Sequence, residues 1–98
     1  MEIKLLRLIT GEDVLAEIVD HGDIAYHIRN PLIVFIRPTE TGVPSVGLSQ
    51  WIPYSADKEF FIKLDRVVVE SNPAEDLRTQ YDRVFGAGII MPSAKLTA

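Results

Sequence analysis

The 98-residue sequence contains no cysteine. This absence excludes disulfides, thiolate zinc sites, iron–sulfur clusters and cysteine nucleophiles together. Long hydrophobic runs are also missing, and the N-terminus has no basic region followed by a long apolar one. The sequence therefore predicts neither a membrane-spanning helix nor a signal peptide. We expect a soluble cytoplasmic protein, since a chain without cysteine suits a reducing compartment.

An excess of positive charge is the next feature that the sequence lacks. Ten basic residues stand against fourteen acidic ones, which gives a net charge of −4. This balance argues against binding duplex DNA through a broad positive surface. The charges are also unevenly distributed along the chain. Positions 1–23 hold two basic and six acidic residues, whereas positions 24–37 hold two arginines, Arg29 and Arg37, and no acidic residue.

The chain is rich enough in apolar residues to fold, but it is small. Hydrophobic residues make up 47% of the 11.0 kDa chain, which is typical of one globular domain. A domain of this size buries only about 60–65% of its unfolded surface, so its own core gives little surplus stability. Burial against further copies of the same chain would add to that stability, and we therefore expect a homo-oligomer.

Hydrophobic alternation with a period of two dominates the first 70 residues. It predicts five strands, separated by turns rich in glycine, proline and aspartate, at about residues 3–8, 14–19, 24–36, 46–54 and 60–69. Asn30-Pro31 interrupts the third run and predicts a bulge or a sheet edge there, which would let one long strand bend sharply and serve two sides of a barrel. Residues 37–47 are expected to form a loop or an extended hairpin tip. The predicted fold is mainly β, a small, strongly bent antiparallel barrel.

The period changes after residue 70. Asn72 suits a helix N-cap and Pro73 suits the first helical position. One apolar stripe then follows with helical spacing: Ala74, Leu77, Tyr81, Val84 and Phe85. The predicted organisation is a barrel over residues 1–70, a helix over 71–86 that Gly86 ends, and a loosely held tail over 87–98.

No group of side chains in the sequence makes up a reactive site. His21 and His27 are the only histidines, and turn and strand roles explain them better than metal binding, which needs three or four convergent ligands. The serines lack a Gly-x-Ser-x-Gly motif, and no glycine-rich phosphate loop is present. We therefore expect a protein that is not an enzyme and that carries no metal and no cofactor. The aromatic cluster formed by Trp51, Tyr54, Phe60 and Phe61 has two interpretations, a stacking surface for single-stranded bases and, more simply, a core or a subunit interface.

Two segments carry a resemblance to a known family. Residues 8–18 place Gly11 between two apolar strands, as in the first Sm motif, and residues 62–67 (Ile-Lys-Leu-Asp-Arg-Val) resemble the Ile-Arg-Gly-x-x-Val of the second. With Asn30-Pro31-Leu32 and residues 51–54 (Trp-Ile-Pro-Tyr), the layout resembles the Sm-like superfamily, which includes bacterial Hfq. Among its members it is most similar to small Sm-like proteins encoded by marine tailed phages, which would place it in the host cytoplasm.

The resemblance implies an SH3-like barrel that assembles into a homo-oligomeric ring of about five to seven copies. In such rings the fourth strand of one protomer pairs with the fifth of the next, and single-stranded RNA is held near the pore. The resemblance thus implies an RNA chaperone or regulator of RNA pairing. The candidate residues are, for RNA binding, His21, Asp23, Lys63 and Arg66, and, for the subunit interface, Trp51, Tyr54, Val67 and Val69.

A second hypothesis comes from a different class. The net charge of −4 and the altered second motif, in which Leu64 replaces a glycine, favour a ring-shaped assembly or protein-interaction module that has lost RNA binding. Asp20, Asp23 and Asp65 would lie around the pore of such a ring, where they would repel phosphate.

Overall fold

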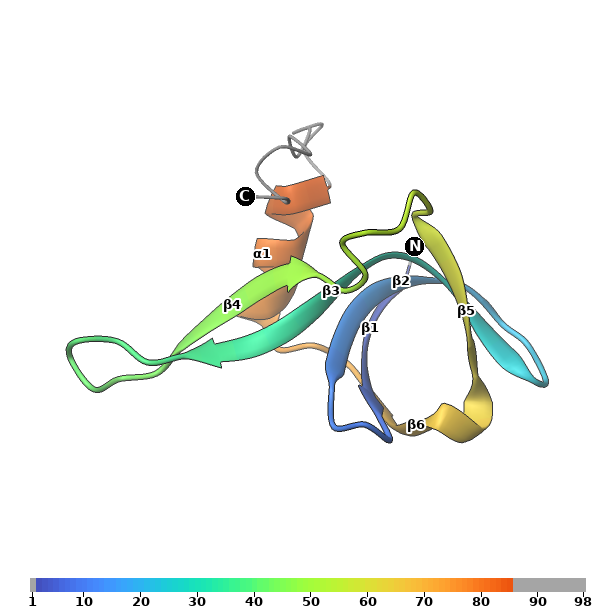
Figure 1. Ribbon diagram of the computed structural model, residues 1–98, viewed down its shortest axis with the longest axis horizontal. Coiled ribbons are helices and arrows are strands. Elements are labelled where there is room, and N and C mark those ends of the chain that lie inside the picture. Colours follow the sequence, from blue (N-terminus) through green and yellow to red (C-terminus); the bar gives the residue numbers. More distant parts are fainter. Residues whose placement is uncertain (1, 86–98) are drawn as a thin grey trace.

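A computed structural model describes residues 2–85 of the chain (Figure 1). The elements, in chain order, are β1 (Glu2–Leu8), β2 (Asp13–His21), β3 (Ala25–Arg37), β4 (Ser45–Gln50), β5 (Glu59–Lys63), the 3-10 helix η1 (Leu64–Arg66), β6 (Val67–Ser71) and α1 (Glu75–Phe85). The predicted tail over 87–98 and the predicted helix end at Gly86 lie outside the described residues. Between residues 2 and 85 no helix has the length and apolar character to cross a membrane.

The strands form one antiparallel sheet that bends into a barrel. β3 is central, because its first half pairs with β5 and its second half pairs with β4, while β2 lies along its other side. Five strands surround the barrel in the order β5-β3-β2-β1-β6, and β4 with the outer half of β3 extends away from it as a hairpin (Figure 1). We call this hairpin, residues 34–48, the arm. The predicted mainly β barrel with a C-terminal helix is confirmed.

The sheet has six strands where alternation alone predicted five. The run over 60–69 is two strands, because η1 turns the chain between β5 and β6. The predicted strand over 46–54 ends at Gln50, so Trp51 and Tyr54 lie in the connection between β4 and β5 rather than in a strand.

The bulge predicted at Asn30-Pro31 is present. Leu15 pairs with Leu32 and Glu17 pairs with Arg29, so β3 contains one more residue than β2 across this interval. Asn30 takes a left-handed backbone with φ of 52°, a conformation that asparagine tolerates better than most residues. At this point β3 exchanges β5 for β4 as its partner, and the strand therefore serves two sides of the molecule as expected.

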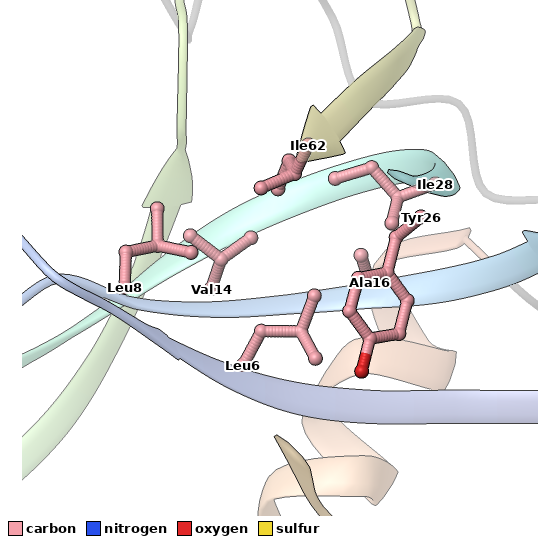
Figure 2. Packing of buried hydrophobic residues seen from close by; sticks show 7 residues of the cluster. All are labelled: Leu6, Leu8, Val14, Ala16, Tyr26, Ile28 and Ile62. Carbon is pink, nitrogen blue, oxygen red and sulfur yellow. The ribbon is translucent and has the colours of Figure 1, made fainter. Parts of the chain in front are cut away.

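The inner face of the sheet encloses the barrel core. Figure 2 shows its buried members, which come from four different strands: Leu6, Leu8, Val14, Ala16, Tyr26, Ile28 and Ile62. Their alternation along β1, β2 and β3 is the period-two pattern of the sequence. Trp51 and Phe60 pack against this core from the β4–β5 connection and the start of β5, with their rings edge to face at 5.8 Å.

The outer face of β1, β2 and β3 forms a second core under α1. Ile3, Leu15 and Leu32 of the sheet are buried against Leu77 and Tyr81 of the helix. The predicted apolar stripe is therefore the face that α1 buries. A strand with apolar residues on both faces needs cover on both, and in this protein the barrel and the helix supply it.

The start of α1 differs from the sequence prediction. The helix begins at Glu75, and the amide of Arg78 donates to the carbonyl oxygen of Ala74 at 3.0 Å. Asn72 does not cap it, because Lys4 Nζ donates to Asn72 Oδ1 at 2.6 Å. The asparagine therefore links the segment before the helix to β1, and Pro73 precedes the first turn.

Candidate functional site

Two turns that are far apart in the sequence meet at one corner of the barrel. The amide of Leu64, the first residue of η1, donates to the carbonyl oxygen of Ile24 at 2.8 Å. Lys63 lies directly opposite Ala25 in the β3–β5 ladder. The turn between β2 and β3, which contains Asp23, is therefore next to the junction of β5 and η1.

The side chains at this corner leave the sheet on two faces. His21 lies opposite Tyr26, which belongs to the barrel core, and their rings pack edge to face at 4.5 Å. Lys63 lies opposite Ala25, the next residue along β3, and neighbouring residues of a strand point to opposite faces. His21 is therefore on the inner face and Lys63 on the outer face of the same corner.

Arg66 lies toward a different turn. Its carbonyl oxygen accepts a hydrogen bond from the amide of Ile9, in the turn between β1 and β2, at 2.9 Å. Its guanidinium Nε is 3.5 Å from Asp65 Oδ1, and both side chains are largely exposed. The structure thus brings together the segments that carry His21, Asp23 and Lys63 and places Arg66 at the far end of η1.

Glu70, which the sequence interpretation did not single out, is the centre of a polar cluster on the inner side of this corner. Tyr26 Oη donates to Glu70 Oε1 at 2.5 Å, and His21 Nε2 is 3.9 Å from the same oxygen. Lys4 Nζ is 3.9 Å from Glu70 Oε2. Burial of the phenol, together with the hydrogen bond to Glu70, raises the pKa of Tyr26 to about 12. The sequence did contain a signal for this cluster, because Glu70 is the only charged residue within Val67–Ser71.

The outer face of the corner carries a second cluster. His27 Nε2 is 2.6 Å from Glu59 Oε1, and the His27 ring stacks on Phe61 with centroids 4.5 Å apart and planes 20° apart. Arg29 Nε is 3.7 Å from Glu59 Oε2. Because His27 is on the outer face and His21 on the inner face, the two imidazoles cannot bind one metal ion. Among residues 2–85 no three side chains of His, Asp or Glu come together as a metal site.

The barrel sheet ends in two open edges, one on β5 and one on β6. Within the described residues β5 pairs only with β3, and β6 pairs only with β1. Two backbone hydrogen bonds fix which β5 residues are bonded to β3. The amide of Leu64 donates to the carbonyl oxygen of Ile24, and the amide of Asn30 donates to the carbonyl oxygen of Lys58. By the alternation of antiparallel ladders, the N–H and C=O groups of Glu59, Phe61 and Lys63 then point to the open edge.

Apolar side chains accompany these edges. Phe61 is 73% exposed on β5, and Val68 is 60% exposed on β6. The four interface candidates divide in two. Tyr54 and Val69 are exposed, while Trp51 and Val67 are partly buried against the barrel core of their own chain.

A small five-stranded β-barrel with two open sheet edges and a covering helix defines the structural class of this protein. The chain belongs to the Sm-like family, because the family model of the Sm_like domain matches residues 5–82. This match covers the barrel, the arm and most of α1. A search of curated proteins found no match. The family match names no narrower group, so the likeness to phage-encoded members stays a prediction.

Proposed function

We propose that this protein assembles into a homo-oligomeric ring and that the ring binds single-stranded RNA. Sm-like proteins are commonly RNA-binding rings, and membership of the family is the basis of the proposal. In this chain the proposal rests on the open edges of β5 and β6. When β4 of the arm is left out, β5 and β6 are the fourth and fifth strands of the barrel in chain order.

The edges fit each other as a joint between copies. An unpaired strand edge presents a row of backbone donors and acceptors that another strand can satisfy. Exposed Phe61 on β5 and exposed Val68 and Val69 on β6 supply apolar surface on either side of this backbone pairing. Tyr54, which is 97% exposed just before β5, remains an interface candidate, whereas Trp51 and Val67 support the edge strands from within the barrel.

RNA binding is assigned to the corner where the two turns meet. His21 offers a half-exposed ring for stacking, Asp23 offers a carboxylate for a base edge, and Lys63 offers a charge for phosphate. Because His21 and Lys63 leave opposite faces of the sheet, we propose that they contact different parts of the strand, a base and a phosphate. Arg66, at the other end of η1, offers a second positive charge for phosphate, beside the carboxylate of Asp65.

The test compares Lys63→Ala with Lys58→Ala, a matched loss of an exposed lysine from the residue before β5. Fluorescence anisotropy with short poly-uridine and poly-adenosine RNAs at low and moderate salt measures binding. We expect salt-sensitive binding by the wild type, weaker binding by Lys63→Ala with a shallower salt dependence, and no change for Lys58→Ala. Equal binding by both variants would contradict the assignment of Lys63.

One observation favours the second function, a ring-shaped assembly or protein-interaction module without RNA binding. Carboxylates crowd the same corner: Asp20 and Asp23 flank its first turn, Asp65 is beside Arg66, and Glu70 is beside His21. Negative charge repeated around a ring would repel phosphate. A ring that binds neither RNA at low salt would identify this second function.

A further inference from the structure

The arm carries a third open edge, which the ring does not use. Within the described residues β4 pairs only with β3. The amide of Trp51 donates to the carbonyl oxygen of Pro31 at 3.3 Å, in continuation of the β3–β4 ladder. Hydrogen-bonded and non-hydrogen-bonded pairs alternate along an antiparallel ladder. Because Trp51 is in a hydrogen-bonded pair, the N–H and C=O groups of Gln50, Leu48 and Val46 point away from β3 to the outer edge.

This edge has none of the features that protect an edge strand. Residues 41–56 contain no aspartate, glutamate, lysine, arginine or histidine, in a chain with 24% charged residues. Natural edge strands are commonly blocked by charges, by proline within the strand or by bulges, and the β3–β4 ladder is regular from Leu32–Gln50 to Arg37–Ser45.

Apolar side chains surround the same edge. Ile36 is 72% exposed and Val46 opposite it is 42% exposed. A groove of about 330 Å³ lies between the arm and the last turns of α1. Its lining is apolar along β4 (Val46, Gly47 and Leu48) and includes two basic residues, Arg37 and Arg83. β4 itself has no charged side chain and lies beside exposed apolar area, and arginine, which lines the groove, is enriched at protein interfaces.

We infer that the β4 edge is a second interface, at which two copies of this chain join by antiparallel pairing of their β4 strands about a two-fold axis. This inference goes beyond the proposed ring. An open strand edge calls for a strand as its partner, and an antiparallel pair of identical strands satisfies both edges with the same residues. The chain has a net charge of −4, so two copies repel each other least where neither carries charge, which is along residues 41–56. The arm extends away from the barrel, which leaves its tip at a distance from the β5 and β6 edges of the ring joint (Figure 1).

The test uses Val46→Pro, which removes an outward N–H without removing a bond to β3, since proline is tolerated at such edge positions. Val46→Ala is the matched control, because it trims the same side chain and keeps the N–H. Native mass spectrometry of the full chain measures the assemblies, and circular dichroism checks that each variant is folded. We expect the wild type and Val46→Ala to have twice the mass of Val46→Pro.

Phe61→Pro separates this interface from the ring. Phe61 also points its N–H to an open edge, that of β5, so the variant blocks the ring joint and is expected to leave a dimer held by β4. A dimer in Phe61→Pro that becomes a monomer on adding Val46→Pro supports the β4 interface whether or not a ring forms. If the folded wild type and the folded Val46→Pro variant have equal masses, the inference is overturned. The remaining partner for the β4 edge is then a strand from another protein.

Discussion

The two faces of the β1–β2–β3 sheet are covered in different ways. The inner face is closed by the same sheet, which curves around Leu6, Val14 and Ile28, so its core is made by strands alone. The outer face depends on one helix, α1, joined to β6 by residues 72–74. The barrel core is therefore a property of the whole sheet, whereas the outer core is held by a single attached element. We expect the first to control global unfolding and the second to open locally.

The largest expected effect comes from the barrel core. Leu6 is fully buried, so Leu6→Ala should lower the free energy of unfolding by about 2–5 kcal/mol, measured by urea denaturation. Leu77→Ala removes a leucine of similar burial from the helix side. In native-state hydrogen exchange we expect Leu6→Ala to speed exchange throughout the barrel and Leu77→Ala to speed it mainly in α1. The same exchange pattern in both variants would contradict the distinction between the two cores.

The next effect concerns how α1 is attached. Tyr81 is buried, and its Oη donates to the carbonyl oxygen of Asn30 at 2.8 Å and lies 3.3 Å from that of Arg29. Tyr81→Phe keeps the ring and removes the donor at the bulge of β3. We expect a loss of about 1–3 kcal/mol in the free energy of unfolding. Tyr54→Phe, which removes an exposed hydroxyl, should leave that free energy unchanged.

A smaller effect is expected at the bulge itself. The left-handed backbone of Asn30 is unfavourable for most L-residues, so Asn30→Ala should cost about 1–2 kcal/mol. Asn30→Gly accepts this backbone and should unfold at nearly the wild-type denaturant concentration. If alanine is tolerated as well as glycine, the bulge is not what fixes β3 between its two partners.

The smallest effect is expected for a surface ion pair between β1 and β2, next to the turn that joins them. Arg7 donates to both carboxylate oxygens of Asp13, at 2.7 and 2.9 Å, and these bonds hold the pKa of Asp13 below its ordinary value of 3.8. The folded protein therefore gains stability above pH 3.8 that it loses as the pH falls through the lowered pKa. Asp13→Asn should be less stable than the wild type by up to about 1 kcal/mol at pH 6. The two should converge in thermal melts near pH 2, and a constant difference would exclude the ion pair as its cause.

Alternation of apolar residues was sufficient to predict most of the barrel. The strand around Leu6, the one around Val14 and the bend at Asn30-Pro31 each have a local signal in the sequence. The turn η1 has none, because apolar Ile62, Leu64 and Val67 continue almost with strand spacing through it. The N-cap prediction at Asn72 failed for another reason, since Lys4, 68 positions away in the chain, takes the side-chain oxygen.

The candidate site could be predicted only in part for a similar reason. The resemblance gave Asp23 and Lys63 as candidates for one RNA-binding site, and the hydrogen bond from the amide of Leu64 to Ile24 makes the segments that carry them neighbours. Simple alternation from inward-facing Ile18 would put His21 on the outer face with Lys63. However, Ile18 pairs with Ile28 and Asp20 with His27, so β2 contains an extra residue at this point. This irregularity turns His21 inward toward Tyr26 and Glu70, and nothing in the local sequence indicates it.

Gly47 shows how closely the arm is packed. A Cβ atom at this position would lie 2.5 Å from the ring of Phe35, which crosses the strand there. Any side chain would displace that ring. Glycine at this position therefore leaves room for the Phe35 ring to lie across β4.

The central claim is that the open edges of β5 and β6 join copies of this chain into a ring. Native mass spectrometry of the wild type and Phe61→Pro, with Phe61→Ala as the variant that keeps the N–H, tests it most directly. The account predicts a closed assembly of at least about five protomers of 11.0 kDa each for the wild type and Phe61→Ala, and its loss in Phe61→Pro. A wild-type protein that stays a monomer, or a Phe61→Pro variant that keeps the full assembly, would contradict it.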